Sequence, residues 1–178
     1  MAKMQQTAES LIARLFRMSE ETWARHANPW SVYTRTTALP LLTLAIWSRQ
    51  WFNWWCLVGV GAALVWIWFN PRIFRRPHAT DNWASKGVFG ERVWLARKTL
   101  PVPDHHRVMP HILSAGSGIG LLFLVWGLWR LELWAALAGN VVVIASKLWF
   151  LDRMVWIYED MKDADATYKS WVYRDRDG

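Results

Sequence analysis

Histidine and carboxylate side chains gather just outside the apolar segments of this chain, where they could bind a metal. Asp104, His105 and His106 are consecutive, and Asp152 and Glu159 are seven residues apart. On a helix, a spacing of seven places both carboxylates on one face. Imidazole together with carboxylate suits Zn, Fe or Mn. These residue types therefore predict a divalent-metal site made by His105, His106, Asp152 and Glu159.

Two further ionisable residues, His26 and Arg35, lie near the start of the first apolar segment. Charge next to hydrocarbon is unfavourable unless it is paired, so we expect Arg35 to pair with Asp152 or Glu159. The predicted site is one pocket near the inner membrane surface, formed by His26, Arg35, His105, His106, Asp152 and Glu159. The alternative is that these charges only anchor the chain at the interface, with long side chains reaching back to the headgroups.

Motifs of well-characterised enzyme classes are missing from the sequence. It has neither H-E-x-x-H nor C-x-x-C for zinc, and no G-x-S-x-G elbow for a nucleophilic serine. The single cysteine, Cys56, lies within an apolar segment and cannot form an internal disulfide. The sequence therefore assigns no catalytic residue.

Four apolar segments must position the candidate residues: 29–48, 51–69, 111–129 and 133–151. Each is about 20 residues long, and a helix of that length matches a hydrocarbon core about 30 Å thick. Short turns near Arg49 and Arg130 join the segments in pairs. The predicted fold class is all-α: a polytopic membrane protein with four transmembrane helices in two hairpins, residues 1–178 forming one membrane domain.

Outside these spans, the sequence predicts interfacial amphipathic helices. Residues 7–25 place apolar and charged side chains at helical spacing, a pattern typical of a helix on a membrane surface. Within the polar loop 70–110, an apolar stripe that starts at Phe89 and Val93 predicts a second, shorter one. Residues 164–178 read as a polar tail.

The distribution of charge predicts orientation and partners. A net charge of +7 would suggest nucleic acid in a soluble protein. Here, however, all but two of the 21 Lys and Arg residues lie outside the predicted turns. By the positive-inside rule, both termini and the 70–110 loop are cytoplasmic, in the cell (inner) membrane. We therefore expect anionic lipid headgroups as partners, and no nucleic acid.

Small residues four apart predict where the helices approach closely. The third span contains Gly116 and Gly120, and also Ser114 and Gly118. The other two spans with this spacing contribute the pairs Gly59 and Ala63, and Ala135 and Gly139. We expect Gly116 and Gly120 to face another helix.

Four stretches of the sequence are similar to a family of small, Trp-rich prokaryotic integral membrane proteins of unknown function. They are His26–Ser31, Trp83–Gly87, Gly90–Arg92 and Trp149–Trp156. This resemblance implies a membrane location and no established activity. The two-hairpin layout also resembles, in architecture alone, the membrane di-iron desaturases and hydroxylases. Those enzymes carry about eight histidines in H-x-x-x-H and H-x-x-H-H boxes, whereas this chain has five histidines and neither box.

Two functions remain open at this point. The first is a small scaffold or accessory subunit that binds lipid or a membrane-protein partner. The partner could be a second copy of this chain, which would make a homo-oligomer. The second is a membrane-embedded enzyme that acts on a lipid-like substrate at the cytoplasmic interface. The candidate metal ligands allow this enzyme to be metal-dependent.

Overall fold

The computed structural model describes residues 19–174, and every named element in that range is helical. The N-terminal helix predicted for residues 7–25 therefore lies mostly outside the described residues, as does the end of the predicted tail. The longer helices are α2 (Glu20–His26), α3 (Pro29–Thr36), α4 (Ala38–Trp47), α6 (Cys56–Ile73), α7 (Trp83–Leu95), α8 (Met109–Arg130) and α9 (Leu133–Met161). Short helices are α5 (Arg49–Phe52), η1 (Asn53–Trp55), η2 (Asp104–His106) and α10 (Ala166–Lys169).

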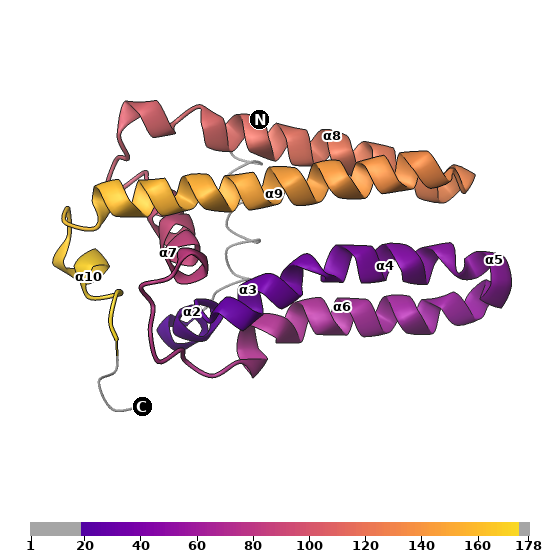
Figure 1. Cartoon of the computed structure of the whole chain (residues 1–178), viewed down its shortest axis with the longest axis horizontal. Helices are drawn as coiled ribbons and strands as arrows, with labels where there is room; N and C mark the ends of the chain where they lie inside the picture. The colour runs from indigo at the N-terminus through magenta and orange to yellow at the C-terminus, as the bar shows by residue number, and fades with distance from the viewer. Residues whose placement is uncertain (1–18, 175–178) are drawn as a thin grey trace, which may run out of the picture.

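The first hairpin is formed by α3 and α4 on one arm and α6 on the other, and the two arms run antiparallel (Figure 1). Asn28 caps α3 by accepting from the Trp30 N–H at 2.9 Å, with Pro29 in the first turn. Between the arms, α5 and η1 reverse the chain at Asn53, whose φ is 48°. The second arm therefore begins at Cys56 and not at the predicted residue 51.

The second hairpin consists of α8 and α9, and glycines let these helices approach closely. A Cβ atom on Gly127 would lie 2.4 Å from the Ala136 nitrogen. A Cβ on Gly116 would meet Ser146 Oγ at 3.0 Å, and one on Gly120 would meet Val142 at 2.9 Å. The prediction that Gly116 and Gly120 face another helix is thus confirmed.

Two sets of hydrogen bonds tie the hairpins together. Near the turns, Arg49 Nη2 donates to the carbonyl oxygens of Leu128 and Trp129 at 2.5 and 2.8 Å. These carbonyls end α8, where a helix dipole favours a positive charge. Farther along, Asn140 Nδ2 donates to Thr43 Oγ1 at 3.0 Å. Polar pairs of this kind join helices whose surroundings are otherwise apolar.

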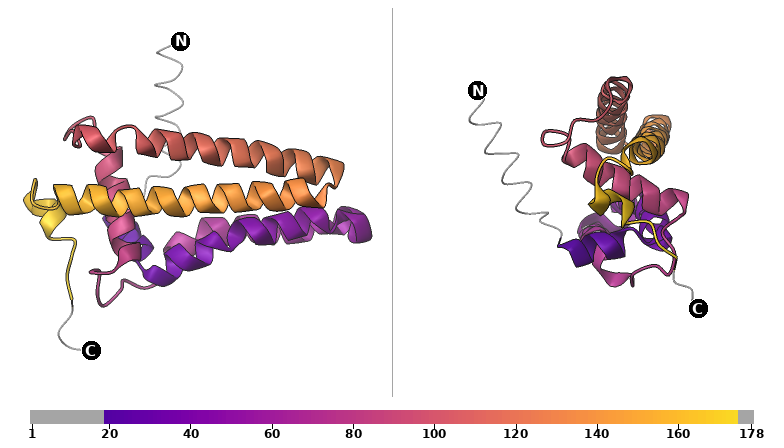
Figure 2. Two further views of the ribbon diagram at one scale, coloured as in Figure 1. Left: turned by 45° about the horizontal axis from the view of Figure 1, so that its top comes forward. Right: turned by 90° about the vertical axis from the view of Figure 1, so that its left-hand side faces the viewer.

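At the other end of the molecule, α7 lies across the helices of both hairpins (Figure 2). The 70–110 segment was predicted to be a polar loop with an interfacial helix, but α7 is buried on most sides. Close contact with α9 requires glycine, because a Cβ on Gly90 would lie 1.8 Å from the Met154 carbonyl oxygen. This end holds the main core, which includes Ala27, Val88, Val93, Met154, Ile157 and Tyr158.

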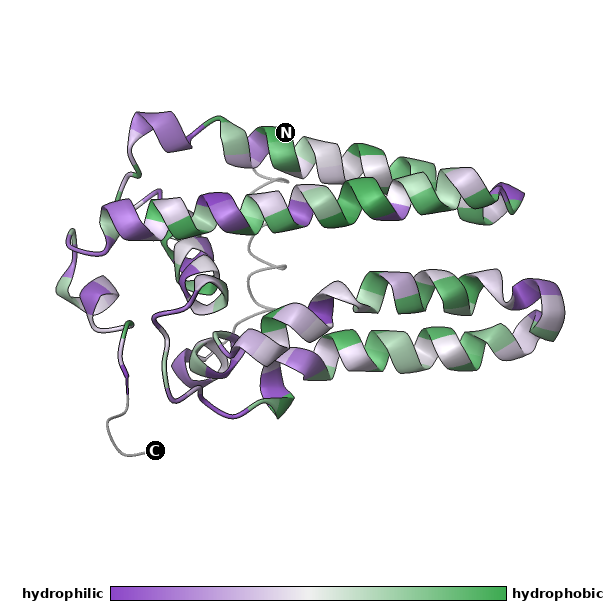
Figure 3. Cartoon of the chain, viewed as in Figure 1, coloured by the Kyte–Doolittle hydropathy of each residue, from purple (hydrophilic) through white to green (hydrophobic). Residues whose placement is uncertain are grey.

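Three helical regions are long and apolar enough to cross a membrane: Pro29–Ile73, Asp104–Arg130 and Leu133–Met161. Apolar residues predominate along α4, α6, α8 and α9, whereas hydrophilic residues gather at the two ends (Figure 3). Large apolar side chains also remain exposed along these helices, Leu122 at 72% and Val141 at 65% among them. Such a surface is unfavourable in water over this extent. The arrangement indicates a membrane protein.

Candidate functional site

The structure divides the six predicted site residues among three places. His26 and Arg35 line a cavity between the first hairpin, α7 and α9. His105 and His106 lie beside the end of α9. Asp152 and Glu159 face α7.

Asp152 and Glu159 share one face of α9, as their spacing predicts, but that face packs on α7. Trp83 Nε1 donates to Asp152 Oδ1 at 3.2 Å, and Lys86 Nζ donates to Glu159 Oε1 at 2.5 Å. Lys162 donates to the other carboxylate oxygen of Glu159 at 2.7 Å.

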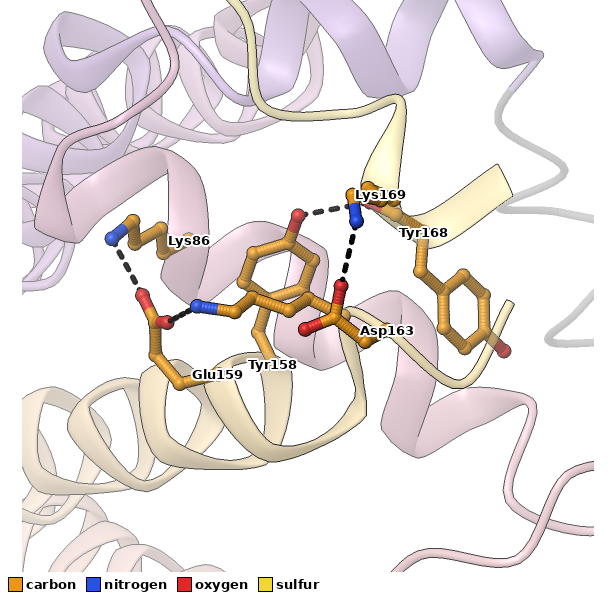
Figure 4. A network of polar contacts seen from close by, with 7 residues as sticks. Lys86, Tyr158, Glu159, Asp163, Tyr168 and Lys169 are labelled. Atoms are coloured by element: carbon orange, nitrogen blue, oxygen red, sulfur yellow. Dashed lines mark hydrogen bonds and ion pairs between the residues drawn. The ribbon is translucent and has the colours of Figure 1, made fainter. Parts of the chain in front are cut away.

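Figure 4 shows the ion pair of Lys86 with Glu159 beside two contacts that join α10 to α9 and to the turn that follows α9. These are the Tyr158 hydroxyl, which donates to the Tyr168 carbonyl at 2.9 Å, and the Lys169–Asp163 ion pair at 3.1 Å. Asp152 and Glu159 therefore hold elements together. The expected pairing of Arg35 with either of them is corrected: Arg35 contacts His26 instead.

The cavity around Arg35 is about 130 Å³ in volume and combines an apolar wall with a charged patch. The apolar wall is made by Val32, Leu39, Val88, Val143, Ile144, Leu148 and Leu151. The polar side chains are His26, Arg35, Thr36, Glu91 and Lys147.

A chain of hydrogen bonds holds Arg35 in place. Arg35 Nη1 lies 3.0 Å from His26 Nε2, and His26 Nδ1 lies 3.4 Å from Ser31 Oγ. Ser31 Oγ donates to Asn70 Oδ1 at 3.0 Å, and Asn70 Nδ2 donates to Thr34 Oγ1 at 2.8 Å. Because the Ser31 hydroxyl donates to Asn70, its oxygen accepts from Nδ1–H of His26. This assigns the tautomer from the network and leaves Nε2 of His26 to accept from Arg35.

The same network leaves the guanidinium of Arg35 incompletely satisfied. Its Nε is buried and finds no hydrogen-bond partner among the described residues. Its Nη2 lies 3.1 Å from His26 Nδ1, which carries a proton in the assigned tautomer and cannot accept. A buried donor without an acceptor is unfavourable by roughly 1–3 kcal/mol, and more when it is charged. The guanidinium of Arg35 is thus held through its Nη1 atom, whereas its Nε and Nη2 atoms lack acceptors.

The charges lining the cavity leave it positive. Lys147 Nζ donates to Glu91 Oε1 at 2.9 Å, so these two charges offset each other. Burial, together with the charges of Arg35 and Lys147, lowers the pKa of His26 to about 3, so its ring is neutral at neutral pH. The charge of Arg35 is therefore the unbalanced positive charge of the cavity, and it lies beside the apolar wall.

Glu91 and Lys147 were not among the predicted site residues. Glu91 lies in the 70–110 segment, whose composition predicts a cytoplasmic loop. The neighbouring glycines Gly87 and Gly90 could have indicated that this segment packs against another helix. They are three residues apart, on the closely packed face of α7. Lys147 is the one charged residue within α9 before Asp152, a position that marks it for an internal partner.

His105 and His106 meet a carboxylate, but it is Asp160 and not Asp152 or Glu159. His106 Nε2 lies 2.8 Å from Asp160 Oδ2, and His105 Nε2 lies 3.2 Å from the same oxygen. Asp160 follows Glu159 by one residue, which turns it by about 100° around the helix toward η2. The four metal ligands predicted from the sequence thus do not come together.

An all-helical chain with three helices apolar enough to span a bilayer is a helical membrane protein, here with a charged cavity between its hairpins. The chain belongs to DUF6653, a family of unknown function whose model matches residues 7–173. No curated protein and no solved structure matches it. The predicted membership of an uncharacterised family is confirmed in this form, whereas the likeness to membrane di-iron enzymes gains no support.

Proposed function

We propose that this protein crosses the membrane four times and binds one anionic lipid in the cavity between its hairpins. The observation that carries this proposal is the placement of Arg35 in that cavity, with an unpaired Nε and an apolar wall beside it. An anionic lipid presents an oxygen-rich head and an apolar chain, which are the two chemistries that the cavity offers.

The arrangement also accounts for how the charge of Arg35 is tolerated. The guanidinium lies between the core end of the molecule and the apolar hairpins, and the proposed topology would put it at the depth where lipid headgroups meet hydrocarbon. A phosphate or carboxylate there would accept from donors that the protein leaves unused. Lys147, whose side chain is 58% exposed, can shift from Glu91 toward the same anion.

Four crossings follow if both hairpins insert fully, because the region Pro29–Ile73 folds back on itself at α5. We propose an orientation with the turns outside and α7 in the cytoplasm, in the cell membrane. This orientation places most Lys and Arg residues inside and lets them face anionic lipid. The exposed side chains of Trp54, Trp55 and Trp134, each more than 75% accessible, would lie at the outer interface.

Cysteine labelling in intact cells tests this topology. In a Cys56→Ser background, single cysteines at Gln50 and Glu132 are expected to react with a membrane-impermeant maleimide. A cysteine at Thr99, just beyond α7, is expected to react only after lysis. All three positions are exposed on the protein surface, so the side of the membrane on which each cysteine lies decides whether it reacts. Labelling of Thr99→Cys with silence at both turns would reverse the orientation.

The binding proposal is tested by lipid competition on the purified protein. The chain, in a neutral detergent, is mixed with equal amounts of phosphatidylglycerol and phosphatidylcholine that carry identical acyl chains. We expect intact-complex mass spectrometry to show one retained phosphatidylglycerol per chain, preferred by roughly tenfold or more. Both lipids carry a phosphate, but the choline cation of phosphatidylcholine is repelled by the unbalanced charge of Arg35. A difference of about 1.4 kcal/mol between the two lipids corresponds to a tenfold preference. Equal retention of the two lipids would refute anion recognition.

A further inference from the structure

A second cluster of ligand-type side chains lies away from the lipid cavity, at the end of α9. Nitrogen atoms of His105 and His106 and a carboxylate oxygen of Asp160 all lie within 4.8 Å of one another. Ligands at about 2.1 Å from a tetrahedral zinc ion are roughly 3.4 Å apart, so small side-chain movements would seat a metal between them. The two imidazole rings lie with centroids 4.1 Å apart, both directed at the same carboxylate.

Two of these groups, His106 and Asp160, come from ordered helices and are positioned without a metal. His106 is buried, with 7% of its surface exposed, and it comes from the short helix η2. Pro103 precedes that helix directly and restricts its backbone, and Pro110 lies in the first turn of α8, four residues after His106. Asp160 extends from the last turns of α9, one of the longest rigid elements of the fold. A ligand set fixed by two separate elements loses little freedom when it binds an ion.

We propose that His105, His106 and Asp160 bind one divalent transition-metal ion of the zinc class. Two imidazoles and one carboxylate are the ligand set of open zinc and non-haem iron sites, in which further positions take water or another ligand. The hollow beside these residues is about 330 Å³ in volume and leaves room for such a ligand.

Among the residues that the structure describes, Arg153 is the one Lys or Arg that lines this hollow, and its charge bears on which ligand the metal would hold. Asp152 offsets part of that charge, because its Oδ2 lies 3.3 Å from Arg153 Nη2. The Nε of Arg153 is buried and has no hydrogen-bond partner within residues 19–174. An anionic ligand on the metal would therefore find a guanidinium beside it, and a carboxylate or phosphate group fits that environment best.

The metal site shares no residue with the lipid cavity, so either proposal can fail without the other. The test uses the full chain purified through a tag without histidines, stripped with chelator and titrated with Zn²⁺ by calorimetry. We expect one Zn²⁺ per chain. His105→Ala, at a largely exposed residue, and the isosteric Asp160→Asn are each expected to weaken binding at least tenfold with unchanged thermal unfolding.

A matched control separates this site from the one that the sequence predicts. Glu159→Gln removes a carboxylate from the same stretch of α9 and is expected to leave the affinity for Zn²⁺ within twofold. Co²⁺ bound in place of Zn²⁺ is expected to give visible d–d absorption that disappears in His105→Ala. If no Zn²⁺ binds to the wild-type chain, the proposal is overturned. The same holds if Glu159→Gln lowers the affinity as much as Asp160→Asn does.

Discussion

Alanine in place of Gly90 is expected to destabilise the protein by on the order of 2–4 kcal/mol, a large effect for one added methyl group. The new Cβ would lie 1.8 Å from the carbonyl oxygen of Met154 and 2.4 Å from its carbonyl carbon. Both atoms belong to the backbone of α9, which cannot rotate away as a side chain would. The two helices must separate, and the core between them opens. The midpoint of thermal unfolding in detergent measures the loss.

The matched control is Gly118→Ala. A Cβ at Gly118 would meet nothing within 4 Å, so this variant adds the same methyl group to open space. Alanine is favoured over glycine within a helix by about 1 kcal/mol, so the control should be neutral or slightly stabilised. If Gly90→Ala unfolds at the same temperature as Gly118→Ala, α7 does not pack on α9 as described, and Glu91 is not held at the cavity.

Replacing Arg35 with glutamine is expected to remove most of the preference for anionic lipid, a change of about tenfold or more in relative affinity. Glutamine keeps a donor for His26 but has neither the positive charge nor the guanidinium fork. With Arg35 neutralised, Glu91 balances Lys147 and the cavity has no excess charge. The competition between phosphatidylglycerol and phosphatidylcholine gives the measurement.

Arg97→Gln serves as the control for loss of charge alone. Arg97 donates to the Trp94 carbonyl at 2.8 Å and lies outside the cavity. The Arg97→Gln variant loses the same charge as Arg35→Gln, but its preference for phosphatidylglycerol should stay within twofold of that of the wild type. If the two variants lose preference equally, net charge attracts the lipid and the cavity has no special part in binding.

Much of the fold could be predicted because membrane helices carry strong local signals. The Asn28 cap followed by Pro29, the apolar runs and the glycines of α8 each reflect a physical requirement that acts within a few residues. Helical periodicity likewise placed Asp152 and Glu159 correctly on one face of α9. These features required no knowledge of which helices would become neighbours.

The candidate site was harder to predict, because its residues are brought together by α7. The sequence of residues 70–110 predicts a polar loop with a short interfacial helix, but its prolines and charges give no sign that this helix is buried. Burial of α7 depends on Gly87 and Gly90 meeting α9, a contact between distant parts of the chain. Once α7 occupies that place, it takes Asp152 and Glu159 as partners and supplies Glu91 to the cavity. Arg35 and the histidine pair are consequently left at separate sites.

Two adjacent threonines allow the most direct test of lipid binding in the cavity. Thr36 lines the cavity, whereas Thr37 is exposed outside it. Each is replaced by cysteine in the Cys56→Ser background, and the rate of modification by N-ethylmaleimide is followed as phosphatidylglycerol is added. The account predicts that the lipid slows modification of Thr36→Cys at least fivefold, leaves Thr37→Cys unchanged, and has no such effect when phosphatidylcholine replaces it. Equal rates for Thr36→Cys with and without phosphatidylglycerol would contradict it.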